Sequence, residues 1–258
     1  MKTKPYIFGI LFILVSFTSM SQTLFHPAAS RGHADHGWLN THHSFSFASW
    51  HNPERMHFGA LRVLNDDQVA AGRGFGRHPH DNMEIISIPL SGSLRHEDSM
   101  GNVAVIEQGD VQIMSAGTGV IHAEHNNSDE EGVDFLQIWI FPNARDLQPR
   151  YDQQSFSLED ERNQWKCVVS PLGMEDDGVQ IHQNAWLHLG TWSESKNFRY
   201  TKKRSENGVY AFVLEGSVQL QGESLGPRDA MGIIDSDTLD FASSAEARVL
   251  LLEVPMQW

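Results

Sequence analysis

The chain has 258 residues, with 19 Lys and Arg against 33 Asp and Glu, so its formal net charge is −14. Hydrophobic residues make up 40% and charged residues 20%, a composition that is typical of a folded protein and excludes a disordered one. The acidic balance argues against a nucleic-acid partner, because phosphate binding needs concentrated Lys and Arg. The single cysteine, Cys167, excludes an intrachain disulfide and any cysteine-based zinc or iron–sulfur site.

The first 21 residues have the pattern of a secretory signal peptide. Lys2 and Lys4 precede an almost unbroken apolar stretch at 6–17, and Ser19 and Ser21 are small residues at the positions that a signal peptidase reads. The apolar stretch is shorter than the roughly 20 residues of a membrane span. We therefore predict cleavage after Ser21, a periplasmic or secreted protein, and no stable membrane anchor after cleavage. A retained N-terminal anchor is the alternative.

From residue 57 onward, short runs of alternating apolar residues are separated by turn residues, as in all-β sandwiches and barrels. The first strands are expected at 58–64, 84–90, 103–106, 111–114 and 135–141, with turns at 65–67, 91–93, 100–102 and 108–110. After a polar connector at 143–152, strands are expected at 168–170, 179–182, 185–189, 209–218, 230–234 and 248–254. No segment has a sustained 3.6-residue apolar period, so we expect little helix.

The two halves of the chain resemble each other. The segment 88–94 is similar to 213–218, and 108–114 is similar to 227–233, which indicates a duplicated β-sandwich unit. Twelve of the 14 histidines lie at or before His125, so any metal chemistry is expected in the first copy. We predict an N-terminal metal-binding domain at 22–145 and a degenerate C-terminal domain at 146–258.

Two short motifs supply candidate metal ligands. His78 and His80 are two residues apart, so on a strand both side chains point to one face, and His122 and Glu124 form a second such pair. If the two strands face each other inside a barrel, three imidazoles and one carboxylate converge. That set suits a divalent first-row metal such as Fe(II), Mn(II), Ni(II) or Zn, and an octahedral sphere would keep two positions for water, substrate or dioxygen.

Glu84, four residues after His80, has two interpretations. It is either a fifth ligand or a carboxylate that accepts a hydrogen bond from a ligand histidine, and we favour the hydrogen-bonding role. Five earlier histidines show no clean ligand spacing, and we interpret them as structural residues rather than a second metal site: His33, His36, His42, His43 and His51.

The two motifs resemble those of cupins, which are double-sheet jelly rolls. Four longer segments resemble the pirin family: 31–47, Leu61-Arg-Val-Leu-Asn-Asp-Asp, Gly74-Phe-Gly-Arg-His-Pro-His, and 113–124. The resemblance extends from about residue 24 to the C-terminus. The resemblance implies a bicupin, with two jelly-roll domains of which only the first binds metal. It implies His78, His80, His122 and Glu124 as ligands of one divalent metal, Fe(II) first and Mn, Ni, Co, Cu or Zn as alternatives, with Glu84 outside the set.

The resemblance to bacterial pirins also implies quercetin 2,3-dioxygenase activity on quercetin or a related flavonol. The metal would act as a Lewis acid, Glu124 or nearby Glu84 as the base, and dioxygen would open the central ring with loss of carbon monoxide. The alternatives are a non-enzymatic metal or redox sensor and a metal-storage or structural cupin. Pirins are typically intracellular, with a nuclear role in animals, and the predicted export signal argues against a transcriptional role here.

Overall fold

The computed structural model of the chain describes residues 22–157, 162–243 and 246–258. The predicted signal peptide, residues 1–21, lies outside the described residues. The described part consists of strands and one short 3-10 helix, η1 (Ala28–Ser30), with no α-helix, so the all-β prediction is confirmed. In this part of the chain no helix is long and apolar enough to cross a membrane.

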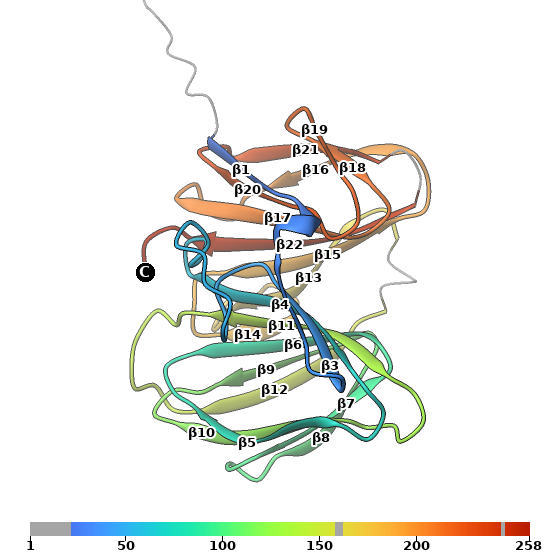
Figure 1. Cartoon of the computed structure of the whole chain (residues 1–258). Coiled ribbons are helices and arrows are strands. Elements are labelled where there is room, and N and C mark those ends of the chain that lie inside the picture. The colour runs from blue at the N-terminus through green and yellow to red at the C-terminus, as the bar shows by residue number, and fades with distance from the viewer. Residues whose placement is uncertain (1–21, 158–161, 244–245) are drawn as a thin grey trace, which may run out of the picture.

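The first half of the chain forms a seven-stranded sheet, in the order β12-β9-β6-β11-β4-β3-β2, and a four-stranded sheet, in the order β5-β10-β7-β8 (Figure 1). The strands are β2 (Gly32–Asp35), β3 (Leu39–His43), β4 (Leu61–Val69), β5 (Gly74–His80), β6 (Glu84–Ser91), β7 (Ser93–Asp98), β8 (Val103–Glu107), β9 (Asp110–Ser115), β10 (Val120–Asn126), β11 (Val133–Ile140) and β12 (Arg150–Ser155).

The second half repeats this plan. A seven-stranded sheet runs in the order β1-β20-β17-β22-β15-β13-β14, and a four-stranded sheet in the order β16-β21-β18-β19. The strands are β1 (Gln22–His26), β13 (Trp165–Pro171), β14 (Val179–Ile181), β15 (Trp186–Trp192), β16 (Lys196–Thr201), β17 (Asn207–Glu215), β18 (Val218–Leu220), β19 (Glu223–Leu225), β20 (Ala230–Ile234), β21 (Thr238–Ser243) and β22 (Ala247–Pro255). The bicupin prediction is confirmed.

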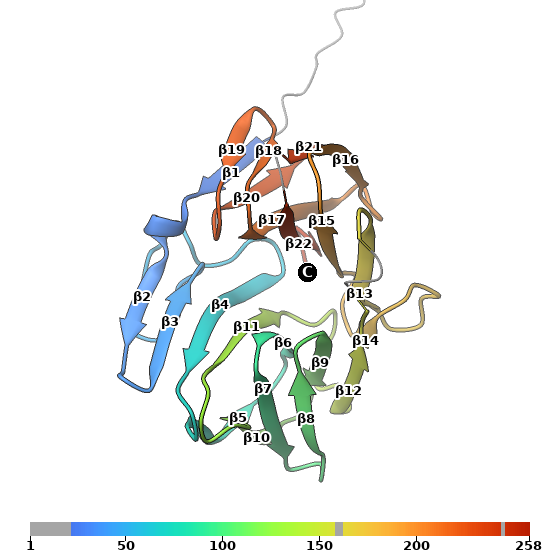
Figure 2. The ribbon, with the colours of Figure 1, turned by 90° about the vertical axis from the view of Figure 1, so that its right-hand side faces the viewer.

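The pairing of two edge strands does not follow the predicted domain boundaries at 22–145 and 146–258. β1 comes first in the chain but pairs with β20 of the second half, and β12 lies beyond residue 145 but pairs with β9 of the first half. Each of these strands extends the edge of a sheet by backbone hydrogen bonds, which carry no side-chain signature of the partner. Figure 2 shows β1 beside β20 and β12 beside β9, so the chain crosses the boundary between the halves once more than predicted, after β1, and makes the later crossing after β12.

The two seven-stranded sheets pack against each other. One apolar cluster contains residues of both, including Leu64 and Leu136 from the first half and Leu187 and Leu252 from the second. Only one face of the first sheet is used for this contact. Its other face points into the interior of the first half, towards the four-stranded sheet, and that face positions the candidate site.

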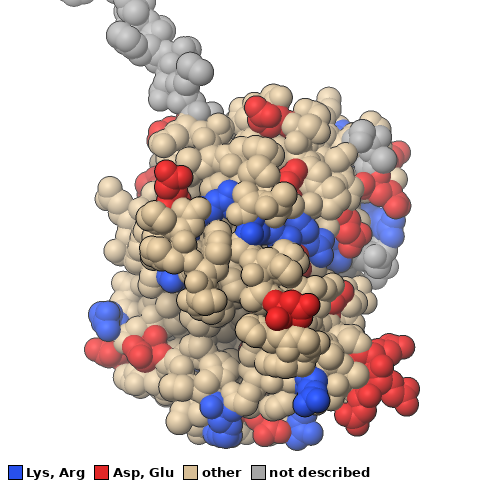
Figure 3. Space-filling model, in the orientation of Figure 1, with Lys and Arg blue, Asp and Glu red and all other residues tan. Residues whose placement is uncertain are grey.

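The turn predicted at residues 65–67 is wrong, because Asn65, Asp66 and Asp67 lie within β4. Side chains alternate between the two faces of a strand, so Asp66 points to the boundary between the halves. There its Oδ2 accepts hydrogen bonds from Arg31 at 3.0 Å and Arg228 at 2.9 Å. Figure 3 shows Lys and Arg side chains gathered near the level where the two halves meet.

Candidate metal centre

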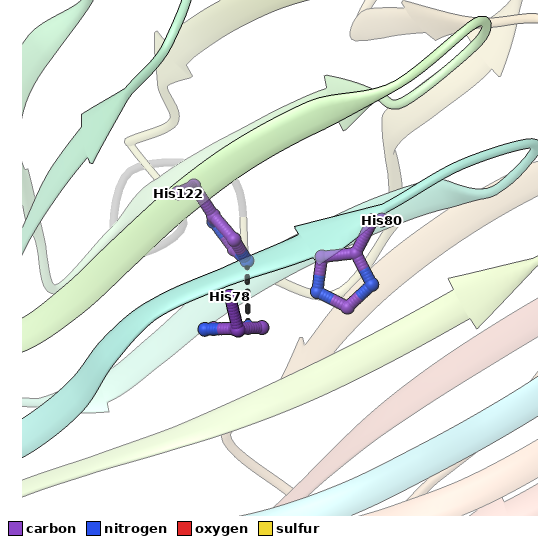
Figure 4. Close-up of side chains that lie close together, drawn as sticks. All are labelled: His78, His80 and His122. Atoms are coloured by element: carbon purple, nitrogen blue, oxygen red, sulfur yellow. Dashed lines mark hydrogen bonds between the residues drawn. The ribbon is translucent and has the colours of Figure 1, made fainter.

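Three histidines converge on one space at the junction of β5 and β10. The two strands are antiparallel neighbours in one sheet, with His122 directly opposite His78, rather than partners facing each other across the barrel. The Nε2 atoms of His78 and His122 are 3.0 Å apart, and the three rings of His78, His80 and His122 face a common space (Figure 4). Ligand atoms of these three residues lie within 4.8 Å of one another, a spacing that a single ion can bridge.

A register shift in the β5–β10 ladder, between His122 and Glu124, affects the direction of the side chains at the site. His122 pairs with His78, but Glu124 pairs with Phe75, so β5 contains one extra residue between the two pairs. Gly74 lies at the end of this segment, and a Cβ atom there would be 2.3 Å from the backbone oxygen of Glu124. Glycine therefore lets β5 approach β10 closely beside the histidine cluster.

Glu124 is buried and held by two hydrogen bonds. Its Oε1 accepts from Ser87 Oγ at 2.9 Å, and its Oε2 accepts from Gln137 Nε2 at 2.9 Å. These bonds come from neighbouring strands β6 and β11, so the seven-stranded sheet fixes the orientation of a carboxylate that belongs to the four-stranded sheet. Partners of this kind orient metal-binding carboxylates in other proteins.

His96 on β7 belongs to the same cluster and was missed by the sequence analysis. A ligand atom of His96 lies within 4.8 Å of those of His122 and Glu124, and the side chain is fully buried. Its Nε2 is 3.2 Å from Asp98 Oδ2, which favours a proton on Nε2 and an unprotonated Nδ1. The spacing His96-Glu97-Asp98 on an alternating strand was the available signal, but no second ligand accompanied it in the sequence.

Glu84 does not accept the predicted hydrogen bond from a ligand histidine. It lies on β6 next to Ile85, and Ile85 faces the cavity, so Glu84 points to the opposite side of the sheet. Its Oε2 accepts a hydrogen bond from Ser115 Oγ at 2.6 Å and one from the backbone N–H of His182 at 3.2 Å. Glu84 therefore contacts no ligand histidine, and burial raises the pKa of its carboxyl group.

The pKa values of two histidines in the cluster favour the neutral imidazole that a metal needs. Burial lowers the pKa of His122 to about 3, with neighbouring His78 and His96 adding to the effect. Burial, with His122 and His78, also lowers the pKa of His80 to about 4. His78 Nδ1 is 2.7 Å from the backbone oxygen of Gly76, so its proton lies on Nδ1 and its Nε2 lone pair points to the cluster.

Neutral imidazoles and an ionised carboxylate are the forms that bind a metal, so the residues present fit a divalent ion. Among the residues that the structure describes, the two groups of side chains close enough to hold an ion both lie in the first half. The four predicted ligands all line one cavity, but they divide between the two groups: His78 and His80 belong to one, Glu124 belongs to the other with His96, and His122 belongs to both. Their assignment as ligands stays a prediction.

The cluster opens into a cavity of about 380 Å³ between the two sheets of the first half. This volume is within the range of about 300–1,000 Å³ of small-molecule sites. Aromatic side chains line one side: Trp139 meets the His80 ring edge-on at 4.9 Å, and Phe47 meets Trp139 at 5.4 Å. Polar side chains of β3 and β4 line another side, among them Asp67, whose pKa burial raises to about 7.

Two stacked jelly rolls, of which only the first holds a histidine–glutamate cluster among the described residues, define a bicupin with a candidate metal centre in its first half. The pirin family profile matches residues 25–140, and the profile described as the quercetinase C-terminal cupin domain matches residues 167–254. The chain belongs to the pirin family, as the resemblance in its sequence indicated.

Two relatives and one solved structure place the chain within this family. It is 39% identical to a quercetin 2,3-dioxygenase of Escherichia coli K12, over 88% of this chain and 96% of the relative. It is 35% identical to a pirin-like protein of Caulobacter vibrioides, over 88% and 97% of the two chains. The crystal structure of the E. coli pirin YhhW in complex with nickel(II) superposes with a TM-score of 0.85 and 37% identity, covering 91% of this chain and 99% of the other.

Proposed function

We propose that this protein is a metal-dependent dioxygenase that cleaves quercetin or a related flavonol with dioxygen. The observation that carries the proposal is that His78, His80 and His122 are close enough to share an ion and that, with Glu124, they line a cavity with aromatic sides. The name of the E. coli relative, quercetin 2,3-dioxygenase, supports the same reaction class.

The chain's own residues supply binding and proton transfer. When bound, the divalent metal supplies a Lewis acid that favours ionisation of the flavonol hydroxyl group. Each oxygen of Glu124 accepts one hydrogen bond and keeps a further lone pair, so the carboxylate can take the proton of that hydroxyl. Phe47 and Trp139 offer ring surfaces against which a flat substrate packs while the cavity excludes bulk water.

We propose Fe(II) as the resident metal, with nickel, manganese, cobalt, copper and zinc as the alternatives to compare. Imidazole and carboxylate ligands accept all of these ions, so the ligand types alone do not select one. The nickel(II) complex of E. coli YhhW makes nickel the first alternative. Metal analysis of untagged protein from its own host identifies the ion.

Oxygen uptake and carbon monoxide release with quercetin test the proposed reaction. The metal-loaded wild type is expected to consume dioxygen, and His122→Ala to lose most of this uptake together with its metal, because its imidazole lies at the centre of the cluster. His125→Ala is the matched control, since His125 is exposed on the same strand. A metal-loaded wild type without flavonol-dependent uptake contradicts the dioxygenase proposal and favours the sensor.

We further propose that the protein is exported. The family match begins at residue 25, after the predicted cleavage site at Ser21, so the segment before it is additional to the matched region. N-terminal sequencing of protein from the native host is expected to start at Gln22 in an extracytoplasmic fraction. Cytoplasmic protein that retains Met1 contradicts the proposal.

A further inference from the structure

A group of polar side chains from β3 and β4 faces the cavity beside the metal cluster. We call His43, Asn65 and Asp67 the polar wall. The register of the two strands places His43 opposite Asn65 and Thr41 opposite Asp67, and all of them line the cavity. His43 and Asn65 are each 2% exposed and Asp67 is 4% exposed, so the three side chains are almost fully buried.

The polar wall has hydrogen-bonding capacity that the described protein residues do not use. Both ring nitrogens of His43, Oδ1 of Asn65 and Oδ1 of Asp67 have no hydrogen-bond partner among the protein groups of the described residues. Most buried polar atoms in folded proteins are hydrogen-bonded, and leaving one unpaired costs about 1–3 kcal/mol. Three such side chains on one cavity wall therefore point to a ligand that enters the cavity and pairs with them.

The polar wall is connected to the metal cluster on two sides. Asn65 lies opposite Gln137 in the β4–β11 ladder, and Gln137 donates a hydrogen bond to Glu124 at 2.9 Å. His43 meets the Phe47 ring edge-on at 5.2 Å, and Phe47 in turn contacts Trp139 at 5.4 Å. A flat molecule held at the metal cluster thus has an aromatic surface on one side and the polar wall within the same cavity.

We propose that the polar wall is the specificity-determining subsite for the hydroxyl groups of the substrate, which rests on the proposed function of a flavonol dioxygenase. Asn65 Oδ1 is an acceptor, ionised Asp67 is an acceptor as well, and the neutral His43 ring offers one donor and one acceptor, so the wall is complementary to hydroxyl groups, which both donate and accept hydrogen bonds. The substrate class that follows is a polyphenol with free hydroxyl groups beyond those at the metal. A flavonol without them would leave the same buried atoms unpaired and bind more weakly.

Anaerobic calorimetric titration tests the subsite, because without dioxygen it measures binding and not turnover. Metal-loaded wild type, Asn65→Leu and Asp67→Leu are titrated with quercetin and with 3-hydroxyflavone, which lacks the additional hydroxyl groups. The wild type is expected to bind quercetin at least about 10-fold more tightly, the effect of one good hydrogen bond. Each leucine variant is expected to reduce this ratio about 10-fold or to near one.

The matched control is Asn40→Leu. Asn40 lies on β3 next to Thr41 but points outward, where its side chain meets His33 and Gln68. This variant is expected to keep the wild-type ratio. Asp67→Asn, which retains one acceptor oxygen and the shape of the side chain, is expected to keep part of the preference for quercetin and remains informative if a leucine variant fails to fold.

A stability measurement separates a binding role from a structural one. Because leucine has nearly the same volume and removes an unpaired buried polar group, Asn65→Leu is expected to have the same or a higher Tm than the wild type. A structural role predicts a lower Tm with an unchanged ratio of the two affinities, and that result overturns the subsite.

The remaining outcomes are decisive as well. Equal affinities of the wild type for both flavonols, or binding of neither, overturn the subsite. If the leucine variants lose the preference for quercetin but the wild type consumes no dioxygen with it, the subsite is supported. Only the proposed dioxygenase reaction is then contradicted. If the protein consumes dioxygen with quercetin but all variants keep the wild-type preference, the dioxygenase reaction is supported and the subsite is contradicted.

Discussion

Glu84 and Glu124 are both buried glutamates in the first half, and their different surroundings give them different tasks. Glu124 projects into the cavity beside three histidines, with Ser87 and Gln137 holding its two oxygens. Glu84 projects to the other face of the sheet and accepts the backbone N–H of His182 from the second half. The first is a candidate metal ligand, and the second joins the two halves.

Substitution of these two residues separates the tasks. Glu124→Gln removes the negative charge that offsets a divalent ion and is expected to weaken metal binding by at least about 10-fold, because even indirect partners of a metal contribute about 10- to 100-fold. Glu84→Gln is expected to keep the metal, since Glu84 contacts none of the clustered histidines. The measurement is metal stoichiometry after dialysis against a weak chelator. If Glu84→Gln loses the metal while Glu124→Gln keeps it, Glu84 and not Glu124 is the ligand.

At the scale of single elements, β5 has to lie unusually close to β10. Gly74 is the residue that allows this approach, because any Cβ atom there would meet the backbone of Glu124 and His125 at 2.3 and 2.4 Å. Gly76, two residues along the same strand, has no atom within 4 Å of the corresponding Cβ position. The two glycines therefore form a matched pair.

Gly74→Ala is expected to push β5 away from β10, separate His78 from His122 and lower metal affinity by about 10-fold or more, as 1 Å displacements at functional sites do. Gly76→Ala is expected to keep the wild-type affinity. Calorimetric titration of the metal into the metal-free proteins measures both. Equal affinity in the two variants would mean that the close approach of the strands does not position the ligands.

At the scale of the whole molecule, the two halves are joined by an ion network as well as by the apolar cluster. Asp66 accepts from Arg31 of the first half and Arg228 of the second, and its side chain is 12% exposed. Asp66→Ala would leave two largely buried guanidinium groups without their carboxylate. Removing one partner of a buried ion pair costs about 3 kcal/mol or more.

Urea unfolding of Asp66→Ala measures this contribution to the free energy of unfolding. The matched control is Asp240→Ala, because the Asp240–Arg199 pair has the same chemistry but side chains that are 67% and 61% exposed. Exposed pairs contribute about 1 kcal/mol or less, so the control is expected to unfold close to the wild type. Equal loss in the two variants would show that the Asp66 network does not hold the halves together.

Buried histidines make the stability of the metal-free protein depend on pH. Burial is the main cause that lowers the pKa of His188, in the second half, to about 4. Between pH 6.5 and 4 the unfolded chain binds a proton that the folded chain does not, so stability is lost as the pH falls through this range. Each such histidine contributes a slope of about 1.4 kcal/mol per pH unit.

His188→Gln is expected to flatten the pH dependence of the unfolding free energy by about that slope between pH 6 and 4.5. Urea unfolding in the presence of a chelator at several pH values measures it, and His125→Gln, at an exposed position, is the control. An unchanged slope in His188→Gln would show that this histidine titrates alike in the folded and unfolded chain.

The all-β class, the duplicated cupin plan, the family and the two pairs His78–His80 and His122–Glu124 could be predicted from the sequence, because they depend on alternation and spacing along single strands. It did not determine partners across strands. β1 pairs with a strand of the second half, β12 pairs with a strand of the first, and residues 65–67 form part of β4 instead of a turn.

The partners of those polar residues depend on how the strands assemble. On one face of β4, Arg31 and Arg228 compensate the charge of Asp66, while Asn65 and Asp67 face the cavity on the other. His96 and Gln137 join the site in the same way, from strands distant in sequence. The physical reason is that the register between strands, set by backbone hydrogen bonds and by packing of the two sheets, is not encoded in the pattern of any one strand.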